Sequence, residues 1–133
     1  MDLILRQARL AHAPETPPTD IGVQDGRIAA IEPHLTAEGS EYDAAGRLVC
    51  AGLVETHIHL DKSRIIDRCA PEAGRDPAAV PRIAAIKPSF TVEDVYARAR
   101  ATLEACLVNG CTHMRTHVEL DAGVEMRSFE ALE

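Results

Sequence analysis

Residues 52–62 read Gly52-Leu-Val-Glu-Thr-His57-Ile-His59-Leu-Asp61-Lys62, and the expected fold follows from this segment. An apolar run, Leu48 to Val54, leads into it, so we expect a buried β-strand whose polar end carries the chemistry. Side chains alternate between the two faces of a strand, which places His57, His59 and Asp61 on one face. Two imidazoles on one face of a rigid strand suit a single Zn, Fe, Cu or Ni ion.

A His-x-His tripeptide also arises by chance, and two surface histidines without a ligand are its plain alternative. The position of the pair favours metal binding, because a second strand with histidines at His113 and His117 follows one helix later. If the two strands are parallel, their carboxyl ends meet at one edge, where α/β folds place their sites.

Composition excludes several functional classes. The 133 residues carry a formal charge of −7 without a basic run, which argues against nucleic-acid and anionic-membrane partners. The four cysteines form no C-x-x-C pair, so a zinc ribbon or a redox motif is not expected. Neither a signal peptide nor an apolar run of about 18 residues is present. We therefore expect a cytoplasmic protein with reduced thiols.

The chain falls into two regions of different pattern. Residues 1–50 predict a small antiparallel all-β unit, with a hairpin turn at Asp25-Gly26. Residues 51–133 predict the histidine strand, a long connection over 62–90 and a helix over 91–109. A second strand over 111–120 and a new helix from Ser128 follow. Within the connection, Asp76-Pro77 is a candidate helix start. Strand, helix and strand together predict a βαβ unit with a parallel pair.

The two histidine motifs together resemble a known family. Residues 47–63, which contain His57-Ile-His59-Leu-Asp61-Lys62, are similar to the start of a metal-dependent amidohydrolase. Residues 114–121, Met-Arg-Thr-His-Val-Glu-Leu-Asp, narrow the resemblance to the cytosine deaminase branch. That branch includes relatives that hydrolyse alkylamino groups from triazine rings. The resemblance covers nearly the whole chain.

The resemblance implies an α/β fold, namely the start of a (β/α)8 TIM-type barrel preceded by part of a small β-sandwich. Residues 1–50 would be the N-terminal part of the sandwich, and residues 51–133 the first βαβ portion of the barrel. His57 and His59 would hold one divalent ion, Zn or Fe. The ion would activate a water that deaminates a cytosine-like nitrogen heterocycle, the small-molecule partner.

The same resemblance implies that much of the enzyme is missing from this chain. The barrel needs eight strands in roughly 200 or more residues, and two are found here. We expect the remaining ligands and the general acid and base beyond residue 133, and we expect the isolated chain to be inactive. Homo-oligomerisation of the full-length enzyme stays open.

Four further polar residues have two readings each. Asp61 would either orient a ligand histidine or cap the turn after the strand. Lys62 would touch substrate, although a solvated lysine is favoured. For His117 we favour packing inside the barrel over an approach to the metal. Asp121 would support the site or contact substrate, with a solvated loop position as the alternative.

Two other functions compete with the deaminase. A stand-alone metal-binding or interaction module would use the same histidine pair without catalysis. Within the superfamily, hydrolysis of a cyclic amide is the second alternative. The Arg-Thr-His motif of the second strand favours deamination over ring opening.

Overall fold

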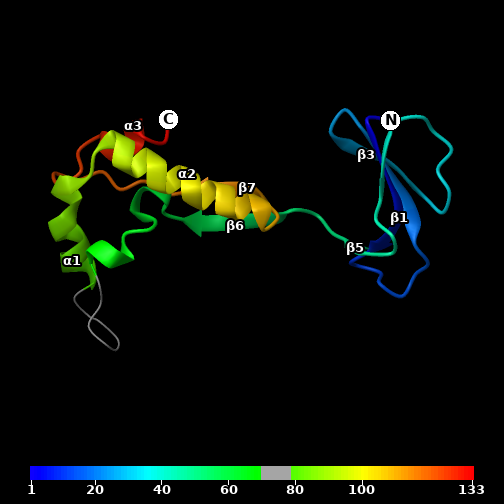
Figure 1. Cartoon of the computed structure of the whole chain (residues 1–133), viewed down its shortest axis with the longest axis horizontal. Coiled ribbons are helices and arrows are strands. Elements are labelled where there is room, and N and C mark those ends of the chain that lie inside the picture. Colours follow the sequence, from blue (N-terminus) through cyan, green and yellow to red (C-terminus); the bar gives the residue numbers. More distant parts are fainter. Residues whose placement is uncertain (70–78) are drawn as a thin grey trace. The chain divides into compact units, whose positions relative to one another are not determined.

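A computed structural model describes residues 1–69 and 79–133 of the chain. The chain divides into two compact units, 1–51 and 52–133, and Figure 1 draws the first in blue and cyan and the second in green to red. The candidate helix start at Asp76-Pro77 lies outside the described residues. No helix in the described ranges is both long and apolar enough to span a membrane.

The first unit is a five-stranded sheet rather than the purely antiparallel unit that we expected. The order is β3-β2-β1-β4, and β5 pairs with the far end of β1. The pairs β1–β2 and β2–β3 are antiparallel, whereas β4 and β5 run parallel to β1. The bounds are β1 (Leu3–Leu10), β2 (Thr19–Gln24), β3 (Arg27–Glu32), β4 (Ser40–Asp43) and β5 (Leu48–Val49). The loop after β3 carries the chain back alongside β1, which makes the last two pairings parallel.

Two local features hold this sheet together. Asp25 and Gly26 both have positive φ, 51° and 69°, as the predicted hairpin turn requires. Asp20 is buried, and its carboxylate accepts hydrogen bonds from the Arg6 guanidinium and from the main-chain N–H of Leu35. A buried carboxylate needs such partners.

The second unit contains the predicted strand–helix–strand element. Strand β6 (Leu53–Ile58) pairs in parallel with β7 (Cys111–Thr116), and α2 (Val92–Val108) connects them. Figure 1 shows α2 lying along the strand pair. The remaining elements are α1 (Ala79–Ile86), α3 (Arg127–Glu130) and the 3-10 turns η1 (Leu60–Lys62), η2 (Ile66–Arg68) and η3 (Lys87–Ser89).

The predicted buried strand differs from the observed one. The apolar run is split, because Leu48–Val49 belongs to the first unit as β5 and β6 begins only at Leu53. Leu53 and Val54 are 60% and 63% exposed, since β6 has one neighbouring strand among the described residues. The second strand and the last helix are also shorter than predicted, ending at Thr116 and Glu130.

Helix α2 begins and ends where the sequence predicts. The Thr91 hydroxyl accepts the main-chain N–H of Asp94 at 3.1 Å, which is the N-cap bond. The helix ends at Val108, and Gly110 follows with φ of +90°, a conformation that glycine adopts without strain.

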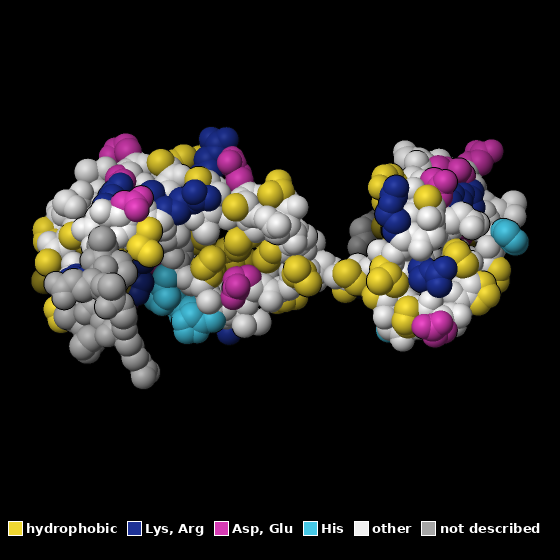
Figure 2. All heavy atoms as spheres, turned by 60° about the horizontal axis from the view of Figure 1, so that its bottom comes forward, with side chains coloured by type: hydrophobic (Ala, Val, Ile, Leu, Met, Phe, Trp, Pro, Cys, Tyr) yellow, Lys and Arg dark blue, Asp and Glu magenta, His cyan; other side chains and the backbone are white. Residues whose placement is uncertain are grey.

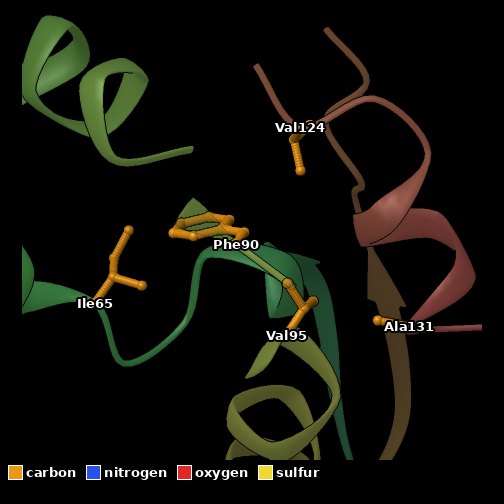
Figure 3. Close-up of a cluster of buried hydrophobic side chains, with 5 residues drawn as sticks. All are labelled: Ile65, Phe90, Val95, Val124 and Ala131. Atoms are coloured by element: carbon orange, nitrogen blue, oxygen red, sulfur yellow. The ribbon is translucent and has the colours of Figure 1, made fainter. Parts of the chain in front are cut away.

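The core of the second unit joins the loop after β6 to the helices. Figure 3 shows five buried side chains meeting between these elements: Ile65, Phe90, Val95, Val124 and Ala131. The Arg98 guanidinium lies 4.8 Å from the centre of the Phe90 ring. Arg98 also donates to the main-chain oxygens of Asp61 and Ser63 at 3.0 and 2.7 Å. Helix α2 is thereby tied to the turn after the histidine strand.

An ion-pair group holds the first turn of α2. The Asp94 carboxylate accepts hydrogen bonds from Arg68 at 2.9 and 2.6 Å and from Arg98 at 3.1 Å. The bonds from Arg68 lower the pKa of Asp94 from 3.8 to about 2. Burial acts in the opposite direction, and the bond from Arg98 adds a smaller lowering effect.

The close approach of the two strands predicts a steric effect at Gly52. A Cβ there would lie 2.1 to 2.7 Å from the side chain of Thr112. We expect Gly52→Ala to lower the free energy of unfolding by about 1–3 kcal/mol, measured by urea denaturation. Adding Thr112→Ala, which removes the two nearest atoms, should restore part of the loss. Unchanged stability of Gly52→Ala would contradict the packing described here.

The lowered pKa of Asp94 predicts a pH effect. The ionised carboxylate stabilises the fold above its ordinary pKa of 3.8, and this contribution is lost as the pH falls through about 2. Between pH 4 and pH 2, Asp94→Asn should therefore lose less stability than wild type, while the exposed-site control Asp67→Asn should follow wild type. The stability of each protein is measured by its urea midpoint across that pH range. Midpoints that fall in parallel for wild type and Asp94→Asn would refute the prediction.

Candidate metal centre

His57 and His59 lie at the carboxyl end of β6. His57 is the second-last residue of the strand, and His59 directly follows Ile58, the final strand residue. Their ring centres are 5.7 Å apart. The strand alternation predicted from the sequence places both rings on one side, and the ring contact agrees with it.

His117 joins this pair from the neighbouring strand. Its main-chain N–H donates to the carbonyl oxygen of Ile58 at 2.7 Å, which extends the parallel pairing past the end of β7. Its ring centre lies 4.2 Å from that of His57 and 5.5 Å from that of His59. The structure thus places the His117 ring in packing contact with the pair. The predicted role of His117, packing inside the barrel rather than an approach to the metal, stays a prediction. Figure 2 shows histidine side chains gathered on one face of the second unit.

Asp61 lies within η1 and is 1% exposed. One carboxylate oxygen, Oδ2, accepts the main-chain N–H of Glu119 at 2.9 Å. The other, Oδ1, lies 3.4 Å from Nδ1 of His59. The bond to Glu119 links the turn to the end of β7, a contact that neither predicted role of Asp61 described, and the second oxygen faces the histidine.

A cluster of four charged residues surrounds the ends of both strands. The Glu119 carboxylate binds the ammonium groups of Lys62 and Lys87, the latter at 2.5 Å, and Lys87 also binds Asp121 at 2.5 Å. Asp121 and Glu119 raise the pKa of Lys87. Conversely, Lys62 and Lys87 lower the pKa of Glu119, and Lys87 lowers that of Asp121. These shifts favour the charged forms of Lys87, Glu119 and Asp121.

The cluster revises the expectation for Lys62 and adds one residue. Lys62 was favoured as a solvated lysine, but its side chain is about one-fifth exposed and is ion-paired with Glu119. Lys87 is 8% exposed and was not singled out from the sequence. A lysine between Ile86 and Pro88 in a proline-containing connection carries no motif, so only the tertiary contacts reveal it.

A hollow in the surface lies beside His59. Lys62 and the aliphatic side chains of Ile65, Ile66 and Ile83 line it. Ligand sites in proteins are concave and mostly apolar, with few polar groups, and this hollow has that composition.

The donor set fits part of a metal site. Neutral imidazole suits Zn and Fe, and the imidazole rings of His57 and His59 lie close together here. Catalytic zinc takes three protein ligands and water. In the ranges that the structure describes, no group of three or more His, Cys, Asp or Glu side chains is arranged to hold an ion. The described residues therefore offer two neighbouring imidazoles but no complete set of metal ligands.

Comparison with known proteins places the chain in a family. No family model matches. The N-isopropylammelide isopropyl amidohydrolase of Pseudomonas sp. is 31% identical over 98% of this chain and 34% of its own length. A D-hydantoinase of Rhizobium radiobacter is 34% identical over 46% of this chain.

Solved structures agree with this result. The 5-methylcytosine deaminase of Klebsiella pneumoniae, liganded with 5-fluorocytosine, matches 97% of this chain with a TM-score of 0.78 and 31% identity. The N-isopropylammelide isopropylaminohydrolase of Burkholderia multivorans matches 99% with a TM-score of 0.79 and 27% identity. The chain spans about a third of the length of these relatives. It belongs to the amidohydrolase superfamily and corresponds to the N-terminal part of longer members.

Proposed function

We propose that this chain supplies part of the metal site of a hydrolase that acts on non-peptide C–N bonds. The observation that carries the proposal is the position of His57 and His59, side by side at the carboxyl end of a parallel strand pair. Barrel enzymes build their sites at that end. One divalent ion, Zn or Fe, is the proposed cofactor.

The proposed complete fold is the (β/α)8 barrel with a small sandwich. In this proposal residues 51–133 are the first βαβ portion of the barrel, and residues 1–50 are part of the sandwich. The TM-scores to the two solved relatives over nearly the whole chain support it. The remaining ligands and the general acid and base would belong to the part of the relatives that this chain does not cover.

The chemistry follows from the donor set. When bound, such an ion lowers the pKa of a coordinated water towards neutrality and stabilises negative charge on the reacting substrate. His57 and His59 would hold it through neutral imidazole nitrogens. Lys62 and Asp121 are held in the charged cluster beside them, and their proposed role is to support the site or contact substrate. His117, whose ring lies on that of His57, would fix the ring's orientation.

The proposed substrate is a small nitrogen heterocycle whose exocyclic amino group is removed. Two relatives are named for such reactions, on 5-methylcytosine and on N-isopropylammelide. The hollow beside His59 is lined by apolar side chains together with Lys62 and Arg64, a lining that suits a small ring with polar substituents. The net charge of −7 argues against a nucleic-acid partner. A cytoplasmic location stays a prediction.

Cyclic-amide hydrolysis is the second candidate, since a hydantoinase is among the relatives. The match to that protein covers less than half of the chain, whereas the isopropylammelide enzyme matches nearly all of it. Deamination is therefore favoured. The stand-alone module is the remaining alternative, and the experiments below separate it from both enzymes.

The ligand assignment predicts metal content. The protein as encoded by its gene should bind about one Zn or Fe per chain. His57→Ala and His59→Ala should each lose most of the metal, because each removes one imidazole from a small ligand set. Elemental analysis after dialysis measures this. His34→Ala, an exposed histidine in the first unit, is the matched control and should retain the metal. Undiminished metal in both site variants would refute the assignment.

The incomplete ligand set predicts that the 133-residue chain alone has no activity. Release of ammonia from cytosine or 5-methylcytosine, and of isopropylamine from N-isopropylammelide, should equal the rate in buffer. Turnover that disappears in His57→Ala would contradict this prediction. If the complete gene product binds metal but hydrolyses none of these compounds or a cyclic amide, the stand-alone module is favoured.

A further inference from the structure

Two buried polar atoms face each other beside the proposed metal site. Nδ1 of His59 and Oδ1 of Asp61 are 3.4 Å apart, and neither makes a hydrogen bond to any residue that the structure describes. The Asp61 side chain is 2% exposed and that of His59 is 29% exposed, with its Nδ1 on the buried side. Leaving either atom without a partner costs about 1–3 kcal/mol, so a function for this pair is expected.

The second oxygen of Asp61 is already in use. Oδ2 accepts the N–H of Glu119, and the main-chain oxygen of Asp61 accepts from the buried guanidinium of Arg98 at 3.0 Å. The end of β7 therefore holds the Asp61 carboxylate, and helix α2 holds the Asp61 main chain. Oδ1 is the atom left over, and it points to His59.

Glu119 is itself held by ion pairs, so its hydrogen bond keeps the Asp61 carboxylate in a fixed position. Its carboxylate is paired with Lys62, directly after Asp61, and with Lys87 from the distant η3 turn. Movement of the Asp61 carboxylate away from His59 would require breaking the bond to Glu119, whose own ion pairs oppose that movement. A rotation of the imidazole by a small angle is the easier way to close the gap.

The chemistry of imidazole gives this contact a consequence. A neutral histidine carries one proton on either Nδ1 or Nε2, and a carboxylate facing Nδ1 selects the form with the proton on Nδ1. The lone pair is then on Nε2, which is the atom free to bind a metal. Histidines that bind metals usually donate their other N–H to a carboxylate, a carbonyl or water.

We propose that Asp61 is a positioning residue for His59: it accepts a hydrogen bond from Nδ1–H and thereby directs Nε2 towards the metal. This inference rests on the proposed function, because it needs His59 to be a ligand. It goes further in assigning one of the two predicted roles of Asp61 and in naming the atoms involved.

The first test uses the metal-free protein and needs no activity. Long-range ¹H–¹⁵N NMR of the histidine rings reports which nitrogen carries the proton. We expect the Nδ1–H form for His59 in wild type and in the control Asp67→Asn, which changes an exposed carboxylate on the same loop. In Asp61→Ala the Nε2–H form should appear. The same form of His59 in wild type and Asp61→Ala would overturn the proposal.

The second test is metal affinity, measured by competition with a chelator on the complete gene product. Asp61→Ala should weaken Zn binding by about 10–100-fold, the usual effect of removing such a carboxylate. Asp61→Asn keeps one oxygen for the Glu119 N–H, so it preserves the link between the strands while losing the carboxylate at His59. It should show a similar loss of affinity with a smaller loss of stability. Wild-type affinity in a folded Asp61→Asn would show that Asp61 only links the strands.

The two hypotheses fail in different ways. If wild type and Asp61 variants bind metal equally well and His57→Ala does not bind it, the proposed function stands and the role of Asp61 is refuted. If wild type binds no metal, the proposed function fails. The proposal that Asp61 directs Nε2 of His59 towards a metal ion then fails with it.

Discussion

The buried carboxylate of Asp61 is the contact on which the arrangement of the site depends. Asp61 follows the histidine strand directly, and its bond to the N–H of Glu119 joins the end of β6 to the end of β7. Arg98 completes the joint by binding the main-chain oxygen of Asp61 from helix α2. Because the buried carboxylate and the main-chain oxygen of Asp61 both need partners, the turn is fixed to the second strand and to the helix. The imidazoles can then lie next to one another.

Charge pairing extends this joint to more distant parts of the chain. Lys87 reaches Glu119 and Asp121 from the η3 turn, far from both strands in sequence. The same turn leads into Phe90, a buried residue of the hydrophobic core. The same short segment therefore contributes Lys87 to the charged cluster beside the histidines and Phe90 to the hydrophobic core. These contacts fix the carboxyl end of the two-stranded sheet, where the histidines lie, although the strands are otherwise largely exposed.

Much of this could be predicted, and the exceptions have physical reasons. The hairpin at Asp25-Gly26, the cap at Thr91 and the strand–helix–strand order depend on local sequence and were confirmed. The parallel pairing of β4 and β5 with β1 was missed, because strand direction depends on the path of a loop. Lys87 was missed because a lone lysine has no pattern until the fold brings its partners to it. The break after Val49 was missed because the apolar run continues across it.

We propose that His57 and His59 bind one catalytic ion. The most direct measurement is a crystal structure of the metal-loaded protein, with an anomalous difference map recorded at the absorption edge of the metal. We expect one peak about 2.0–2.1 Å from a ring nitrogen of each histidine, with Nε2 as the ligand atom of His59. A peak bound elsewhere, or no peak at these two rings in a fully loaded protein, would contradict it.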